Sequence, residues 1–144
     1  MYPHHGNVVT FLEGLDSSAI VQYGLRGLVP NRRKTPGRNR RVCGTIEQTV
    51  AALEEFGGKP LLVSLDVDVF DPFVIDSVTS PCPNGLDAAM ILLLLSTVAR
   101  MGHKIQLFDL AEFAPTGENA RIQALYLVDF LLRATDCILH PSAK

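Results

Sequence analysis

The sequence predicts an α/β fold in which a parallel sheet carries helices on both faces. Three nearly continuous apolar runs, at 19–25, 61–67 and 105–110, lack the alternation of a half-exposed strand. Such runs are typical of parallel strands that are covered on both sides. Helical patterns separate the three runs, and this order of helices and strands is that of a parallel α/β sheet. At 144 residues the chain is expected to form a single domain, 1–144.

Two helices are expected in the first part of the chain. A short one, from about residue 7 to 13, opens it. The second is the clearest helix in the sequence. It begins at Thr45, which forms a capping box with Gln48, and it ends at the pair Gly57-Gly58, directly before the second apolar run.

Two further helices follow the second and third apolar runs. Residues 86–100 are apolar nearly all round, which indicates a helix buried between layers, and Gly102 closes it. The last helix spans 119–134. Its apolar residues recur with helical spacing, at Ile122, Leu125, Val128 and Leu132.

Composition excludes several classes of protein. The net charge of -2 creates no overall attraction to nucleic acid or to an anionic membrane, and the longest apolar run is too short to span a bilayer. The three cysteines are far apart and form no CxxC pair, which favours a reducing, cytoplasmic location. A hydrophobic content of 47% is high for a free-standing domain, so some apolar surface is expected to meet another chain.

One segment is strongly basic. Pro36 and Gly37 indicate a loop, and no aromatic residue is interleaved there as a nucleic-acid site would require. The segment is either a solvated loop or a site for an anion, a carboxylate or a partner. Its six cations within 32–41 are Arg32, Arg33, Lys34, Arg38, Arg40 and Arg41.

The stretch SLDVDVFDP, residues 64–72, pairs two carboxylates. In an extended chain Asp66 and Asp68 point the same way, and a divalent cation would neutralise their mutual repulsion. Oxygen ligands favour manganese, magnesium or calcium. The alternative is a solvated turn at the end of a strand.

Other polar residues also stand directly after apolar runs. Glu112 comes at the end of the third apolar run, and the basic segment comes after the first. Ligands of parallel sheets bind beyond the carboxyl ends of the strands. These groups are therefore expected to converge with Asp66 and Asp68 on one rim. By contrast, Asp71 is expected to be a turn residue, Asp109 a buried hydrogen-bonded carboxylate and His103 a surface residue.

The stretch SLDVDVFDP, continued as FVIDSVTSPCPNGL, resembles the signature of the ureohydrolase family, which includes arginases, agmatinases and formimidoylglutamases. Ser80 and Asn84 are mild departures, because Thr and Gly are usual there. HHGNVVTFL at 4–12, YGLRG at 23–27 and FDLAEFAP at 108–115 resemble further family segments in the family's order. The matching residues of the signature are Ser64, Asp66, Asp68, Asp71, Pro72, Pro81, Gly85 and Leu86.

This resemblance implies a fold and a chemistry. The fold would be half of an arginase-like three-layer αβα sandwich. The reaction would be the hydrolysis of a guanidine or amidine C–N bond, with two Mn2+ ions that activate water. Asp66 and Asp68 would be metal ligands, Glu112 would pair with the guanidinium, and His5 would pass a proton to the leaving amine. For His5 the alternatives are a polar helix-entry residue or a role for its neighbour His4; for Glu112 the alternative is a carboxylate that caps the loop.

Part of the family's metal site has no counterpart in 1–144. Family members carry an upstream histidine and an Asp-x-His-x-Asp segment, so the chain resembles only the carboxyl-terminal half, and Mn2+ binding by this half alone should be weak. The expected partners are a small guanidino substrate, of agmatinase type rather than arginase type, and either a complementing amino-terminal half or further copies of the chain. The alternative function is an inactive module that serves in assembly or binding.

Overall fold

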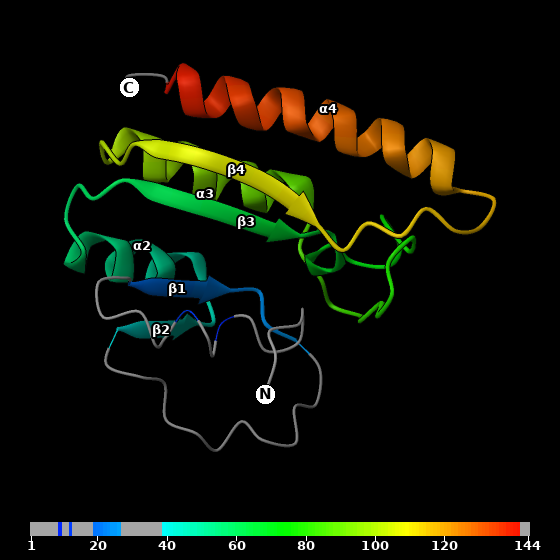
Figure 1. Ribbon diagram of the computed structural model, residues 1–144, viewed down its shortest axis with the longest axis horizontal. Helices are drawn as coiled ribbons and strands as arrows, with labels where there is room; N and C mark the ends of the chain where they lie inside the picture. The colour runs from blue at the N-terminus through cyan, green and yellow to red at the C-terminus, as the bar shows by residue number, and fades with distance from the viewer. Residues whose placement is uncertain (1–8, 10–11, 13–18, 27–38, 142–144) are drawn as a thin grey trace. The chain divides into compact units, whose positions relative to one another are not determined.

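The computed structural model describes Val9, Leu12 and residues 19–26 and 39–141 (Figure 1). The chain forms two compact units that divide after Phe56. The first contains β1 (Ile20–Tyr23), β2 (Arg40–Cys43) and α2 (Ile46–Glu55). The second contains β3 (Leu61–Asp66), the 3-10 turn η2 (Val67–Val69), α3 (Ala88–Arg100), β4 (Ile105–Ala111) and α4 (Ala120–Leu139).

Both strand pairs are parallel, as predicted. β1 pairs with β2, and β3 pairs with β4. Parallel strands with intervening helices confirm the predicted α/β class, whereas the expectation of a single domain stays a prediction. Most of the expected opening helix at 7–13 lies outside the described residues, although Val9 and Leu12 are both helical.

The predicted capping box starts α2. The Thr45 side chain accepts a hydrogen bond from the Gln48 backbone N–H at 3.2 Å. The Gln48 side chain reaches back to the N–H of Gly44, at 2.8 Å, rather than to that of Thr45. The pKa of Glu47 is lowered, first by a hydrogen bond with its own backbone and then by the Thr45 side chain. The Thr45 side chain therefore satisfies one of the backbone N–H groups that the first turn of α2 leaves without a helical partner.

β2 corrects one expectation. Arg40 and Arg41, expected in a loop, form the start of this strand. Their charges are accommodated locally: Arg40 donates to the Gln22 side chain at 2.6 Å, and Arg41 donates to Glu55 at 2.9 Å. The Arg41 guanidinium also lies 5.8 Å from the ring centre of Phe56. Because polar and aromatic partners accommodate both guanidinium groups, this strand can form without a wholly apolar sequence.

The core of the second unit lies between β3-β4 and the helices α3 and α4 (Figure 1). Phe70 packs edge-on against Phe130, with ring centres 5.4 Å apart, and against Tyr126. Only one face of the strand pair contributes to this core. Exposure alternates along β3, and Leu62 on the other face is 73% exposed. Within this unit, the buried side chains of β3 therefore lie on one face of the strand.

α4 turns a different side to the core than its sequence pattern suggested. Its buried residues are Gln123, Leu127, Phe130 and Ala134. The expected apolar positions point away from this core and are 53–70% exposed, namely Ile122, Leu125, Val128 and Leu132. The pattern was ambiguous because α4 is apolar on two sides. Within the described ranges, no helix has both the length and the apolar character that crossing a membrane requires.

His103 also corrects an expectation. It is buried, with 6% of its surface exposed, and its Nδ1 lies 3.3 Å from the carbonyl oxygen of Lys59. His103 lies directly before the start of β4, and Lys59 lies directly before the start of β3. The Leu61 N–H also donates a hydrogen bond to the Lys104 carbonyl, so the ring is buried where both strands begin. The sequence offered no sign of this burial, since His103 stands between Gly102 and Lys104 in a polar connection.

A set of hydrogen bonds between residues 69–73 and 85–86, which we call the backbone lock, fixes the turn that follows β3 and η2. The Asp71 carboxylate accepts hydrogen bonds from the N–H groups of Phe73 and Gly85, both at 3.0 Å. The Leu86 N–H donates to the Val69 carbonyl at 2.8 Å. This confirms Asp71 as a turn residue. The lock joins residues 69–73 to residues 85–86 and holds the chain that leaves β3.

Two residues of the lock explain the local sequence. A Cβ at Gly85 would overlap the backbone of Phe70 and Asp71, so no side chain fits there. Asn84 has φ 62°, in the left-handed region that glycine and asparagine tolerate best. Asn84 is therefore a physically permissible replacement for the glycine that is usual at this place in the signature.

We expect Gly85→Ala to lower the free energy of unfolding by about 1–3 kcal/mol, because backbone must shift to admit the methyl group. Urea denaturation followed by circular dichroism measures this change. Gly44→Ala is the matched control, since a Cβ there meets only the Gln48 side chain at an ordinary distance of 3.6 Å. Equal stability of the two variants would contradict the close approach at Gly85.

We expect Thr45→Ala to lower the free energy of unfolding by about 1 kcal/mol, because the Gln48 N–H loses its side-chain acceptor. Thr45→Ser keeps the hydroxyl and should retain most of the stability. The same denaturation experiment compares them. If the serine and alanine variants unfold alike, the hydroxyl does not stabilise α2.

Candidate active site at the strand ends

The ends of β3 and β4 bring two of the predicted site residues to one edge. Asp66 is the last residue of β3 and pairs in register with Ala111, the last residue of β4. Glu112 follows Ala111 directly. Because the strands are parallel, both carboxylate residues leave the sheet at its carboxyl edge, which is where ligands of such sheets bind.

Asp68 is placed differently from the sequence-based expectation. β3 ends at Asp66, and Val67–Val69 form the 3-10 turn η2. The two-residue alternation of an extended chain therefore does not reach Asp68. Val67 and Val69 are buried, whereas Asp68 between them is half-buried. The valines thus fix a turn that keeps the intervening carboxylate at the surface of the unit.

The roles of Asp66 and Asp68 as metal ligands stay predictions. Among the described residues, no three His, Cys, Asp or Glu side chains gather closely enough to hold a metal ion. Carboxylates suit hard divalent cations by their chemistry. A complete site would therefore need donors from outside the described ranges.

Glu112 adopts a strained backbone conformation. Its φ is 65°, in the left-handed region, which costs a residue with a side chain about 1–2 kcal/mol. Neighbouring bonds impose it: the Ala114 N–H donates to the Ser77 carbonyl at 2.9 Å, and Phe113 forms a bridge with Val78. Backbone strain of this kind concentrates at functional sites. No feature of the sequence signalled this conformation.

A buried glutamine supports the loops around Glu112. Gln123 of α4 donates to the Asp76 carboxylate at 2.6 Å and accepts from the Ser77 N–H at 3.0 Å. The Ser77 hydroxyl donates to the Thr116 carbonyl at 3.2 Å. These bonds join α4, the loop after β3 and the loop after β4. We did not predict this role of Gln123 from the sequence, although a glutamine among the apolar residues of a helix was an available signal.

The remaining predicted groups are only partly described. His5 and residues 32–38 lie outside the described residues, and Arg40 and Arg41 belong to the first unit. The expected convergence of the basic segment with the carboxylates and the role of His5 in proton transfer therefore both stay predictions. Asp109 does accept a hydrogen bond, from Ser64 at 3.4 Å, but its side chain is exposed rather than buried.

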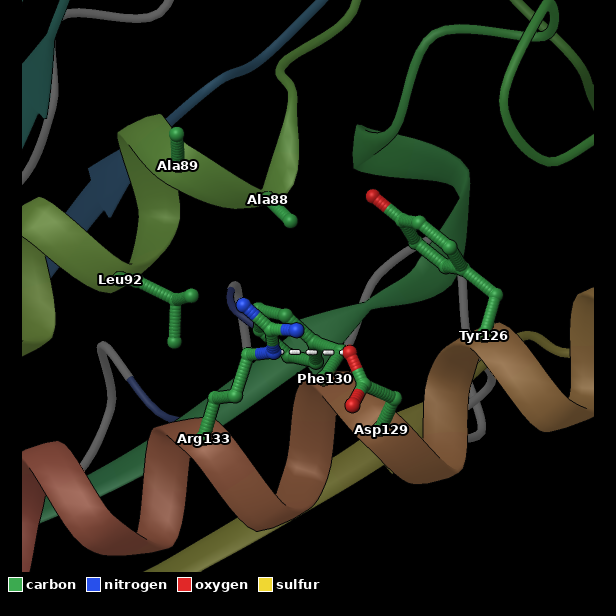
Figure 2. A pocket seen from close by; sticks show the side chains of 7 residues that line it. All are labelled: Ala88, Ala89, Leu92, Tyr126, Asp129, Phe130 and Arg133. Atoms are coloured by element: carbon green, nitrogen blue, oxygen red, sulfur yellow. Dashed lines mark hydrogen bonds and ion pairs between the residues drawn. The ribbon is translucent and has the colours of Figure 1, made fainter.

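A shallow cleft between α3 and α4 is not part of this site. It is lined mainly by apolar side chains, including Ala88, Leu92 and Phe130, as Figure 2 shows. Its charged residues, Asp129 and Arg133, form an ion pair with each other at 2.8 Å. Burial raises the pKa of Tyr126 at its edge, an effect that a hydrogen bond with the Ala88 backbone opposes. The cleft therefore offers a ligand little uncompensated charge.

Comparison with known proteins identifies the family. Residues 2–135 match the arginase family. Proclavaminate amidinohydrolase of Streptomyces clavuligerus is 30% identical over 138 residues, which cover 85% of this chain and 43% of that protein. Its solved structure superposes with a TM-score of 0.59, at 29% identity, over 82% of this chain and 42% of that one. For the arginase structure from Bacillus caldovelox the TM-score is 0.62, at 20% identity, over 86% and 43% of the two chains.

The chain thus spans less than half the length of the curated relative and of these two solved chains. The likeness to the Bacillus caldovelox structure shows the arginase-like αβα fold. The match over residues 2–135 covers nearly the whole chain and includes both β3 and β4. The chain therefore belongs to the arginase family.

Proposed function

We propose that this chain supplies the carboxylate half of a manganese-dependent active site that hydrolyses a C–N bond of a small guanidine or amidine. The observation that carries the proposal is the register of β3 with β4, which sets Asp66 beside the residue that precedes Glu112. Membership of the arginase family supports hydrolysis of guanidino groups in general. The metal, the substrate and the activity of this chain are our proposal.

The metal would be held jointly. The carboxylates of Asp66 and Asp68 match the oxygen donors that Mn2+ takes, but the described residues do not provide a third donor beside them. A complementing amino-terminal half would supply the others. Bound manganese would activate water by lowering its pKa.

Glu112 would recognise the substrate. A guanidinium presents N–H donors in a plane, and a carboxylate accepts two of them in parallel, with charge-assisted bonds. Glu112 directly follows Ala111, the register partner of Asp66, so a guanidinium bound by Glu112 would place its carbon near the proposed metal ligands. An inactive module would have no need to keep this strain, which argues against the alternative function.

His5 would complete the proton transfers. An imidazole can donate a proton to the leaving amine near neutral pH and regain it from water. Its place in the HHGNVVTFL stretch, which resembles the family's His-Gly segment, supports this role. We propose an agmatinase-like substrate and a cytoplasmic location; the three cysteines, which are far apart in the sequence and form no CxxC pair, support this location.

In a complex reconstituted with an amino-terminal half, removal of either of the carboxylates proposed as metal ligands should weaken Mn2+ binding. We expect Asp66→Asn and Asp68→Asn each to raise the dissociation constant about tenfold or more, because a neutral amide is a poorer ligand than a carboxylate. Electron paramagnetic resonance of free Mn2+ measures this. Asp129→Asn is the control, since Asp129 pairs with Arg133 on α4. Wild-type affinity in both strand-end variants would refute the metal site.

Glu112→Gln tests substrate recognition separately. In a complex reconstituted with an amino-terminal half, we expect urea release to fall about 100-fold or more, because the guanidinium loses its counter-charge. Mn2+ affinity should stay at the wild-type value. Glu118→Gln, at an exposed position before α4, is the matched control. Unchanged urea release by Glu112→Gln would contradict the assigned role.

A further inference from the structure

Gln123 is the polar member of the buried face of α4. The other buried residues of that face are apolar, namely Leu127, Phe130 and Ala134. Phe130 packs against Phe70, so the helix is fixed in the core without help from Gln123. An apolar side chain suits such a position, whereas a buried amide costs free energy unless its hydrogen bonds are made. The amide, which is only 7% exposed, therefore has a role that packing alone does not explain.

The two hydrogen bonds of the Gln123 amide have a fixed order. The Ser77 N–H can only donate, so the atom that faces it at 3.0 Å must be the side-chain oxygen. The amide nitrogen then faces the Asp76 carboxylate, at 2.6 Å. Asp76 is exposed, whereas Ser77 is almost fully buried. Gln123 thus ties the backbone of a buried residue to α4 and has its second partner at the surface.

Ser77 in turn binds the loop after β4. Its carbonyl accepts a hydrogen bond from the Ala114 N–H at 2.9 Å, and its hydroxyl donates to the Thr116 carbonyl at 3.2 Å. Val78, the next residue, forms an antiparallel bridge with Phe113. Figure 1 shows the loops after β3 and β4 and the start of α4 at one end of the unit. The start of the loop after β4 is therefore held against the loop after β3.

Glu112 is the single residue between two fixed points. Ala111 before it is the last register partner of β3, and Phe113 after it is bridged to Val78. The pairing changes from parallel to antiparallel between these points, and Glu112 makes the change with φ 65°. This conformation is unfavourable for a residue with a side chain. Glu112 would therefore relax to a negative φ if Phe113 were released.

We propose that Gln123 is a positioning residue for substrate recognition, which orients Ser77 and thereby keeps Glu112 in its left-handed conformation. The inference rests on the proposed function for the identity of the ligand, a guanidinium, but not for the conformational effect. Glu112 touches the substrate, whereas Gln123 acts only through the backbone. The chain around Asp68 is held separately, by the backbone lock at Asp71, so metal binding does not depend on Gln123.

Nuclear magnetic resonance of this chain, isotope-labelled in a complex with an amino-terminal half, tests the conformational effect without any activity. The backbone carbon chemical shifts of Glu112 should indicate a positive φ in the wild-type complex. They should indicate a negative φ in Gln123→Leu, which removes the acceptor of the Ser77 N–H. Gln106→Leu, at an exposed position of β4, is the matched control and should keep the wild-type shifts. A Glu112 that stays left-handed in folded Gln123→Leu would overturn the proposal.

An exchange of donor and acceptor tests the same link even if Gln123→Leu fails to fold. Gln123→Glu keeps an acceptor for Ser77 but faces Asp76 with a second carboxylate. In the double variant Asp76→Asn with Gln123→Glu, the amide introduced at position 76 donates to the carboxylate introduced at position 123. Gln123→Glu should raise the KM for agmatine about five- to tenfold with kcat changed less than about twofold, because binding of the guanidinium is weakened throughout the reaction. The double variant should restore the wild-type KM.

The Mn2+ affinity separates positioning from a general structural role. Measured by electron paramagnetic resonance, it should stay at the wild-type value in all of these variants. An unchanged KM in Gln123→Glu, or a loss of Mn2+ affinity that parallels the rise in KM, would overturn the proposal. A wild-type complex that releases no urea would instead contradict the proposed function, and the chemical shifts of Glu112 would still decide this inference.

Discussion

The final register pair of β3 and β4, in which Asp66 lies opposite Ala111, sets the geometry of the strand-end site. It places Asp66 and Glu112 at one edge, and everything else about the site is built around it. The Asp71 carboxylate holds the chain that leaves β3. Ser77 binds the chain that leaves β4 through its carbonyl and its hydroxyl, and Gln123 in turn accepts a hydrogen bond from the Ser77 N–H. Bonds on both sides of the strand ends thus support the strained conformation of Glu112.

Local chemistry was readable from the sequence wherever one residue decides the structure. The capping residue Thr45, the glycine stop after α2 and the turn at Asp71 were predictable, because each depends on near neighbours in the chain. β2 was not, since its arginines are balanced by Gln22 and Glu55, far away in sequence. The strain at Glu112 was equally hidden, because contacts with the loop after β3 impose it.

The site was therefore only partly predictable. Sequence pattern predicted Asp66 and Glu112 as site residues, and parallel strand order explains why both leave the sheet at one edge; their roles stay predictions. It misplaced Asp68, because the two buried valines of η2 turn the chain where an extended strand was expected. The sequence pattern also did not indicate which of the two apolar sides of α4 faces the core. Periodicity shows that a side of a helix is apolar, but it does not show what packs against that side. The uncovered side, together with exposed Leu62 of β3, is consistent with the high hydrophobic content of the chain.

The account depends most on the strand-end carboxylates acting as one cation site. Anomalous diffraction from Mn2+-soaked crystals of the chain in complex with a complementing amino-terminal half tests this directly, because it locates the metal without reference to activity. We predict an anomalous peak within coordinating distance of the Asp66 and Asp68 carboxylates, at the edge where Glu112 also lies. Ordered carboxylates without a peak between them, or a peak confined to another part of the chain, would contradict the account.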